Sequence, residues 1–234
     1  MTHDTTSGIA LVTGAGSGLG AAIATRLSAR GLTVAVNTRA RVKDAAAVVD
    51  SIRRSGGDGF VVSADVSDLA QVRRMLETVA ERGPLEVLVN NASYRPRQAL
   101  RSITPEDWAA VRRVTLDAAF WCVQAGVPQM GPGASIVNIL GRNAMRGDPA
   151  RVHVSAAKHG LWGLTLALAE ALREEHIAVN AVSPAISTSC ARPDTCRDRI
   201  ADVVVDLTRT QVPMLTGTVR DVDCDDLGEI TPAR

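Results

Sequence analysis

The stretch Thr13-Gly14-Ala15-Gly16-Ser17-Gly18-Leu19-Gly20 lies between an apolar run at 9–12 and a helical pattern at 19–29. Glycines allow the backbone to turn tightly and to approach a pyrophosphate closely, and the amides that open a helix attract the anion. The stretch therefore predicts a strand, a tight turn and a helix that bind a dinucleotide. The residues expected to form this phosphate site are Thr13, Gly14, Gly16, Ser17, Gly18, Leu19 and Gly20.

Short β-branched runs alternate with longer helical patterns along the rest of the chain. Further strands are predicted at 32–36, 60–62, 85–89, 135–140, 177–181 and 219–222, and helices at 42–54, 68–82, 104–125, 151–174 and 197–207. We expect Ser67 to cap the helix at 68–82, and Thr104 with Asp107 to cap the helix at 104–125. Apolar strands without alternation are typical of a parallel sheet that is buried on both faces. With right-handed crossovers, the pattern predicts a single doubly wound α/β domain, a Rossmann domain over residues 1–234, with a mostly parallel seven-stranded sheet.

The overall composition excludes several classes of partner. The chain has 26 Lys and Arg against 25 Asp and Glu, so its net charge gives no reason to expect nucleic acid or an anionic membrane as a partner. The segment at 1–7 is polar and no apolar run is long enough to span a membrane, so we expect a cytoplasmic protein. The four cysteines form no C-x-x-C pair, and no metal site is predicted.

Three further segments agree with the first one: Ala64-Asp65-Val66, Asn90-Asn91-Ala92-Ser93 and Asn180-Ala181-Val182-Ser183-Pro184-Ala185. Together the four segments resemble the short-chain dehydrogenase/reductase family, with Ser93 and Ala185 in place of glycines. The resemblance implies that Asp65 and Val66 lie at the adenine and that Asn91 and Ala92 line the cofactor. It also implies that Pro184, Ala185 and Thr188 lie beside the nicotinamide.

The choice of cofactor is expected to depend on the residues after the second strand, Asn37-Thr38-Arg39-Ala40-Arg41. An acid at this place bonds the ribose hydroxyls of NAD and repels a 2′-phosphate. No acid is present here, and Arg39 can pair with a phosphate through its planar guanidinium. We therefore expect NADP(H), with Asn37 and Arg39 in its site. The alternative is that Arg39 and Arg41 are simply solvated.

The residues that the family uses to move a proton are largely missing. In Val154-Ser155-Ala156-Ala157-Lys158, the lysine that binds the ribose is kept, while Val154 takes the place of the tyrosine. By the same register, Gly141 takes the place of the family's serine and Thr115 that of its asparagine. Lys158 alone cannot do the proton chemistry, although it can still bond the ribose. The resemblance therefore implies an atypical member with a degenerate Asn-Ser-Tyr-Lys site.

Four other residues are candidates to replace the lost groups, beside Lys158. Tyr94, the single tyrosine of the chain, could donate a proton or could form part of the pocket wall. Asn143 could hydrogen-bond a substrate carbonyl. His153 has suitable acid–base chemistry. However, neighbouring side chains on a helix point about 100° apart, so His153 is expected to face away from the direction of Val154. Thr115 could hold water, although helical threonines usually bond their own backbone.

The segment at 185–222 is short for the family's helical insertion, so we expect a shortened substrate lid that suits a bulky or carrier-bound substrate. One hypothesis is a repurposed biosynthetic enzyme that transfers hydride without a tyrosine or guides a non-redox cyclisation or isomerisation. An alternative is a catalytically silent cofactor-binding subunit or sensor, and an ordinary ketone or alcohol oxidoreductase is the third. The partner would be a small-molecule substrate, and the helices at 104–125 and 151–174 suggest a homo-oligomer, a dimer or tetramer.

Overall fold

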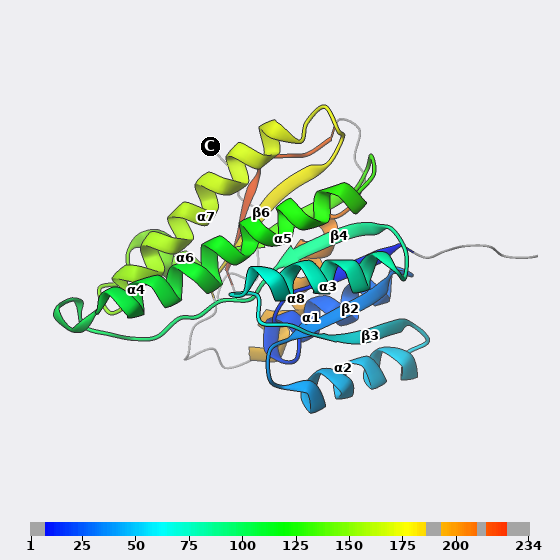
Figure 1. Ribbon diagram of the computed structural model, residues 1–234, viewed down its shortest axis with the longest axis horizontal. Coiled ribbons are helices and arrows are strands. Elements are labelled where there is room, and N and C mark those ends of the chain that lie inside the picture. The colour runs from blue at the N-terminus through cyan, green and yellow to red at the C-terminus, as the bar shows by residue number, and fades with distance from the viewer. Residues whose placement is uncertain (1–7, 186–192, 210–213, 224–234) are drawn as a thin grey trace, which may run out of the picture.

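Seven apolar strands lie side by side in one sheet, as a computed structural model of residues 8–185, 193–209 and 214–223 shows (Figure 1). The strands are β1 (Ile9–Val12), β2 (Thr33–Thr38), β3 (Asp58–Ser63), β4 (Leu85–Asn90), β5 (Ser135–Ile139), β6 (Ala178–Ala185) and β7 (Val219–Asp223). Their order is β3-β2-β1-β4-β5-β6-β7, and every neighbouring pair is parallel. This confirms the doubly wound sheet, because the chain moves outward from β1 to β3 and then returns to place β4 beside β1.

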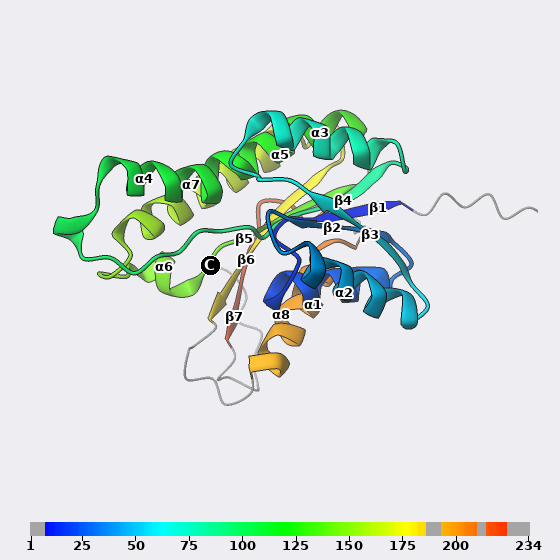
Figure 2. The same cartoon turned by 60° about the horizontal axis from the view of Figure 1, so that its bottom comes forward.

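Helices cover both faces of the sheet (Figure 2). The helices are α1 (Gly18–Ser28), α2 (Val42–Arg54), α3 (Leu69–Ala80), α4 (Pro105–Arg112), α5 (Ala118–Gly126), α6 (Arg142–Arg146), α7 (Val152–Ala171) and α8 (Pro193–Leu207). Helices α1, α2 and α8 lie on one face, and α3, α5 and α7 on the other. Strand β1 serves both layers, because Ile9 and Leu11 join one apolar cluster while Ala10 and Val12 join the second. Buried residues on both faces explain why these strands show no alternation in the sequence.

A chain of buried amides and hydroxyls fixes the middle of the sheet against α7. Asn90 donates to Asn138 at 2.9 Å, and Asn138 donates to Thr165 of α7 at 2.9 Å. All three side chains are buried, so each polar group needs a partner inside the protein. This chain holds β4, β5 and α7 in one register, and it positions the first half of α7 beside the carboxyl ends of the strands.

Two predicted caps meet different outcomes. At α4, the Asp107 amide donates to the Thr104 hydroxyl at 3.2 Å and the Thr104 amide donates to Asp107 at 3.1 Å, so the predicted capping box is confirmed. At α3, the prediction that Ser67 caps the helix is wrong. The N-cap is Asp68, whose carboxylate accepts from the amides of Ala70 and Gln71. The Ser67 hydroxyl instead donates to Asp65 at 2.6 Å, so it is engaged outside the helix, and Asp68 is an equally good capping residue.

Other boundaries also differ from the sequence prediction. The helix predicted at 104–125 consists of α4, a π-helical turn at Arg113–Asp117 (η2) and α5. Short 3₁₀ turns lie at Leu100–Ser102 (η1) and Val127–Gln129 (η3). Helix α6 forms where a loop was expected, and strand β6 extends through Pro184 because that end pairs with β7. Within the described residues, none of the helices combines the length and apolar character that a membrane crossing needs.

Candidate functional site

The glycine-rich turn leaves β1 and enters α1 through two left-handed glycines. Gly14 has a φ of 63° and Gly18 a φ of 59°, values that side chains other than glycine rarely adopt. A Cβ atom on Gly18 would meet open space, whereas one on Gly20 would lie 2.6 Å from both the Gly14 carbonyl oxygen and Asn91 Nδ2. Gly20 therefore allows close packing beneath the turn, and Gly18 leaves the amide end of α1 open to a ligand.

Side chains from neighbouring strands hold this turn in place. Asn37, which is buried at the end of β2, accepts from the Gly14 amide at 3.1 Å and donates to the carbonyls of Val62 and Ala64. The Thr13 hydroxyl accepts from the amides of Asn91 and Ala92, at 3.0 and 3.1 Å. These bonds join the carboxyl ends of β1, β2, β3 and β4 into one rigid floor.

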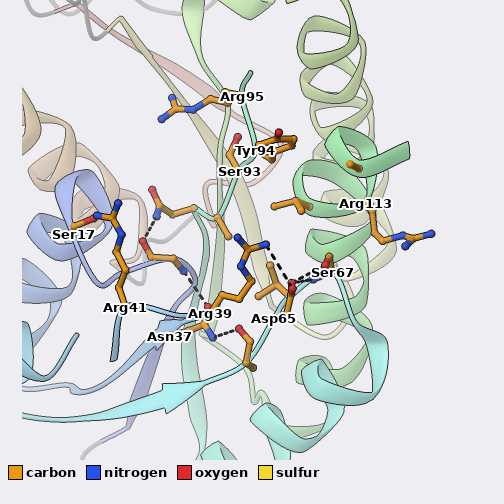
Figure 3. A pocket seen from close by; sticks show the side chains of 17 residues that line it. Ser17, Asn37, Arg39, Arg41, Asp65, Ser67, Ser93, Tyr94, Arg95 and Arg113 are labelled. Atoms are coloured by element: carbon orange, nitrogen blue, oxygen red, sulfur yellow. Dashed lines mark hydrogen bonds and ion pairs between the residues drawn. The ribbon is translucent and has the colours of Figure 1, made fainter. Parts of the chain in front are cut away.

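A cleft with a volume of about 870 Å³ opens above this floor (Figure 3). Its lining residues are Gly14, Ser17, Asn37, Arg39, Arg41, Ala64, Asp65, Val66, Ser67, Asn91, Ala92, Ser93, Tyr94, Arg95, Ala110, Arg113 and Val114. The structure thus brings Gly14, Ser17, Asn37, Arg39, Asp65, Val66, Asn91, Ala92 and Tyr94, all named from the sequence, to one cavity. Four arginines and a single acid among these lining residues make the cleft positively charged, which favours an anionic ligand.

Arg39 lies at the mouth of the cleft with its side chain 70% exposed. Its guanidinium is 3.8 Å from Asp65, and Asp65 in turn accepts from the amide and hydroxyl of Ser67. A contact of this length between a mostly exposed cation and a carboxylate is weak. Arg39 is therefore free to turn toward a phosphate, while the bonds from Ser67 keep Asp65 in place.

Lys158 is buried in α7, with 2% of its surface exposed, and its Nζ donates to the Ile139 carbonyl at 2.5 Å. Burial, and then the positive charge of Arg95, lower the pKa of Lys158 to about 7. Within the part of the chain that the structure describes, no carboxylate pairs with Lys158. The side chain thus points toward the end of β5, close to the cleft but outside its lining.

The structure describes the three positions that the sequence register assigns to the missing proton-transfer groups. Val154 is buried and packs with Val111 and Ala157 in a small apolar cluster. Gly141 has open space where a side chain would stand. Thr115, inside the π-helical turn, is buried, and its hydroxyl has no hydrogen-bond partner among the described residues. None of the three is among the residues that line the cleft, and only Thr115 carries a hydroxyl.

The other predicted site residues lie in different places. Tyr94 is 48% exposed and lines the cleft beside Ser93. Asn143 is exposed on α6, outside the cleft lining. His153 is buried on α7, and neither ring nitrogen has a partner among the described residues. Pro184 and Ala185 end β6, while Thr188 lies outside the described residues.

The sequence analysis missed several cleft residues. Arg95 lies two residues after the Asn90–Ser93 segment, and Arg113 and Val114 belong to the π-helical turn. The position of Arg95 after β4 was a usable signal, because ligands bind beyond the carboxyl ends of parallel strands. Arg113 gave no such signal, since only the packing of the π-helical turn against α7 brings it to the cleft. Among the described residues, no group of three or more His, Cys, Asp and Glu side chains is placed to hold a metal.

Known proteins share this arrangement. A family model described as short chain dehydrogenase matches residues 8–198. A 3-oxoacyl-(acyl-carrier-protein) reductase of Staphylococcus aureus is 35% identical over 208 residues, which cover 88% of this chain and 82% of the relative. A dehydrogenase/reductase from Sinorhizobium meliloti superposes with a TM-score of 0.86 at 29% identity, over 94% of this chain and 96% of the other. An angucycline C-6 ketoreductase with bound NADP gives a TM-score of 0.85 at 29% identity, over 92% and 94% of the two chains.

Proposed function

Since the chain belongs to the short-chain dehydrogenase family, we propose that residues 1–234 act as a single NADP(H)-binding domain of an atypical oxidoreductase. The similar angucycline ketoreductase was solved with NADP, which supports this choice of cofactor. The cleft also fits the group, because it combines an open helix end at Gly18 with a positively charged lining. Arg39 and Arg41 would hold a 2′-phosphate, and no acid stands between them to repel it.

The remaining predicted residues have consistent places around such a ligand. Gly14, Gly16, Ser17, Gly18 and Leu19 would present backbone amides to the diphosphate, with Thr13, Gly20 and Asn37 shaping the turn. Asp65 and Val66 would lie at the adenine, and Asn91 and Ala92 along the ribose. We propose that Lys158 leaves the Ile139 carbonyl to bond the nicotinamide ribose, beside Pro184 and Ala185.

The substrate class rests on one observation: Val154, which the sequence register matches to the family's tyrosine, is buried among apolar side chains. NADPH supplies a hydride when bound, but a ketone that accepts hydride must also gain a proton. Losing a general acid typically slows such a reaction by about 10²–10⁴-fold. We therefore propose an activated or bulky substrate, such as an iminium ion or enone, that accepts hydride without help from tyrosine. A non-redox cyclisation or isomerisation in a biosynthetic pathway, with the cofactor as part of the pocket wall, is the other form of this proposal.

A second candidate is a catalytically silent subunit. Exposed apolar side chains favour it, because Trp108 of α4, Phe120 of α5, and Trp162 and Leu166 of α7 are each 40–45% exposed. Trp162 and Leu166 are four residues apart and so share one face of α7. We propose that these helices form the contacts of a homo-oligomer.

Ordinary ketone reduction is the third candidate function. It is supported by Tyr94, the one phenol in the cleft, which could donate the proton.

Calorimetric titration with NADPH, NADP⁺ and NADH tests the cofactor. We expect NADPH to bind at micromolar concentration and more tightly than NADH. Gly18→Asp should abolish binding, because it places a carboxylate at the diphosphate. Arg39→Ala should weaken NADPH by about tenfold to a hundredfold and leave NADH unchanged. Arg54→Ala, an exposed arginine at the far end of α2, is the control. Equal affinity for NADPH and NADH would contradict the proposed role of Arg39.

Turnover is tested by following NADPH absorbance with a cyclic iminium ion and with a cyclic ketone of the same ring size. The proposal expects oxidation of NADPH with the iminium ion and almost none with the ketone. Equal rates that fall in Tyr94→Phe would instead assign the acid to Tyr94. Tight NADPH binding without turnover of either compound would favour the silent subunit.

A further inference from the structure

Arg95 is a cation that lines the cleft and has no partner among the described residues. It follows β4, and Figure 3 shows it at the end of the cleft opposite Arg39 and Asp65. Its guanidinium makes no hydrogen bond or ion pair with the residues that the structure describes. Although part of the side chain stays open to the cleft, burial lowers the pKa of Arg95, and the charge of Arg151 lowers it further. Arg95 is thus an exposed residue whose positive charge has no carboxylate partner among the described residues.

The charged residues around Arg95 add to the excess of positive charge at this end of the cleft. Lys158 lies close enough for Arg95 to affect it, and its only described partner is the Ile139 carbonyl. The nearby carboxylate, Asp148, is already paired with Arg151 at 3.1 Å and accepts from the Ala150 amide. Below about pH 7, where Lys158 is protonated, two positive charges thus lie near each other without a carboxylate of their own in the described part of the chain. Like charges in a partly buried site are unfavourable unless an anion joins them.

The neighbours of Arg95 indicate what kind of anion fits. Ser93 and Tyr94 line the same end of the cleft, and Val154 lies buried in the adjoining helix. Arg39, which would hold the cofactor's 2′-phosphate, lies at the other end of the cleft, and Figure 3 shows Ser17 of the glycine-rich turn apart from Ser93 and Tyr94. An anion at Arg95 therefore comes from the substrate. A guanidinium presents parallel N–H groups that match the two oxygens of a carboxylate.

We propose that Arg95 is a specificity-determining residue that binds a carboxylate of the substrate, with Lys158 adding to the positive field behind it. This inference rests on the proposed function, because it takes the cleft as the site of both NADP(H) and a small-molecule substrate. It narrows the substrate to an acid whose reacting carbon lies beside the nicotinamide while its carboxylate reaches the end of β4.

The test compares oxo acids of increasing chain length with their methyl esters, because each pair differs only in the charged group. Binding is measured by saturation-transfer NMR, with and without NADPH. We expect at least one acid to bind about tenfold to a hundredfold more tightly than its ester. Arg95→Ala and Arg95→Gln should remove the preference, whereas Arg95→Lys should keep part of it. Arg101→Ala, an exposed arginine on η1, should keep all of it.

Three results would overturn the inference: no acid preference in the unmodified protein, a preference that survives Arg95→Ala, or a loss of NADPH affinity in Arg95→Ala of the size seen in Arg39→Ala. The last result would assign Arg95 to the cofactor. If NADPH fails to bind the unmodified protein, the proposed function is contradicted instead. A preference for the acid over its ester, measured without NADPH, would still support the carboxylate site.

Discussion

Gly20 has the least room of the glycines in the phosphate turn. A Cβ atom there would press against the Gly14 carbonyl oxygen and Asn91 Nδ2, both of which belong to the rigid floor of the cleft. We expect Gly20→Ala to lower the free energy of unfolding by about 1–3 kcal/mol, as overpacking does elsewhere. Urea unfolding followed by circular dichroism measures the change.

Gly163 provides the matched control for this substitution. It lies inside α7, and a Cβ atom there meets open space. Gly163→Ala should therefore raise the free energy of unfolding by roughly 0.5–1 kcal/mol, because alanine favours the helix. If the two substitutions change the free energy of unfolding equally, the residues beneath Gly20 can move apart to accept a methyl group, and the prediction is wrong.

Lys158 makes the stability of the protein depend on pH. Its pKa is about 7 in the folded chain against an ordinary value of 10.5. Between these values the unfolded chain holds a proton that the folded chain has released, so the free energy of unfolding rises as the pH increases from about 7. Below pH 7 both forms are protonated and the full cost of the buried charge remains.

Lys158→Met keeps the length of the side chain and removes its charge. We expect this change to raise the free energy of unfolding at pH 6 by on the order of 2–4 kcal/mol and to flatten the rise toward pH 9. The measurement is urea unfolding at a series of pH values. The other lysine of the chain, Lys43, is exposed on α2, and Lys43→Met should leave the pH profile unchanged. An unchanged profile in Lys158→Met would mean that the buried amine does not cause the dependence.

At the scale of elements, the cap of α4 supports the helix that lies over the cleft. Thr104→Ala removes the hydroxyl that accepts from the Asp107 amide, and it should lower the free energy of unfolding by about 1 kcal/mol. Thr78→Ala makes the same chemical change inside α3, where the hydroxyl only bonds the Arg74 carbonyl, and should cause little loss. Thermal and urea unfolding compare the two variants. A smaller loss in Thr104→Ala than in Thr78→Ala would contradict the importance of this cap.

The elements that depend on local pattern could be predicted from the sequence, and those that depend on distant contacts could not. Strand β1 and the turn after it were predicted because apolar residues and glycines carry that signal locally. The π-helical turn within 104–125 was missed, since its wide backbone arises from packing. The extension of β6 through Pro184 likewise depends on pairing with β7.

The candidate site shows the same division. Arg39 was expected at the cofactor's phosphate because its place directly after β2 can be seen in the sequence. Asn37 was expected at the cofactor, but its bonds to Gly14, Val62 and Ala64 could not be seen in the sequence. The positive surroundings of Arg95 could not be predicted, because Lys158 and Arg151, which lie near it in the fold, are more than fifty positions away in the chain.

At the scale of the whole molecule, the exposed apolar side chains of α4, α5 and α7 predict self-association. Light scattering should give the mass of a dimer or tetramer, and Trp162→Glu together with Leu166→Glu should reduce it to that of a monomer, because a buried contact cannot hold unpaired charges. Val42→Glu, at an equally exposed apolar residue of α2, is the control and should keep the assembly. A monomeric mass for the unmodified protein would contradict the prediction.

Tyr94 gives the protein a further use in the laboratory. It is the single tyrosine of the chain, and it stands in the wall of the cleft with 48% of its surface exposed. Growth on fluorotyrosine would therefore place one fluorine nucleus per chain, and place it where ligands are proposed to bind. A single resonance would then report each occupant of the cleft, so compound libraries could be screened by fluorine NMR before any reaction is known.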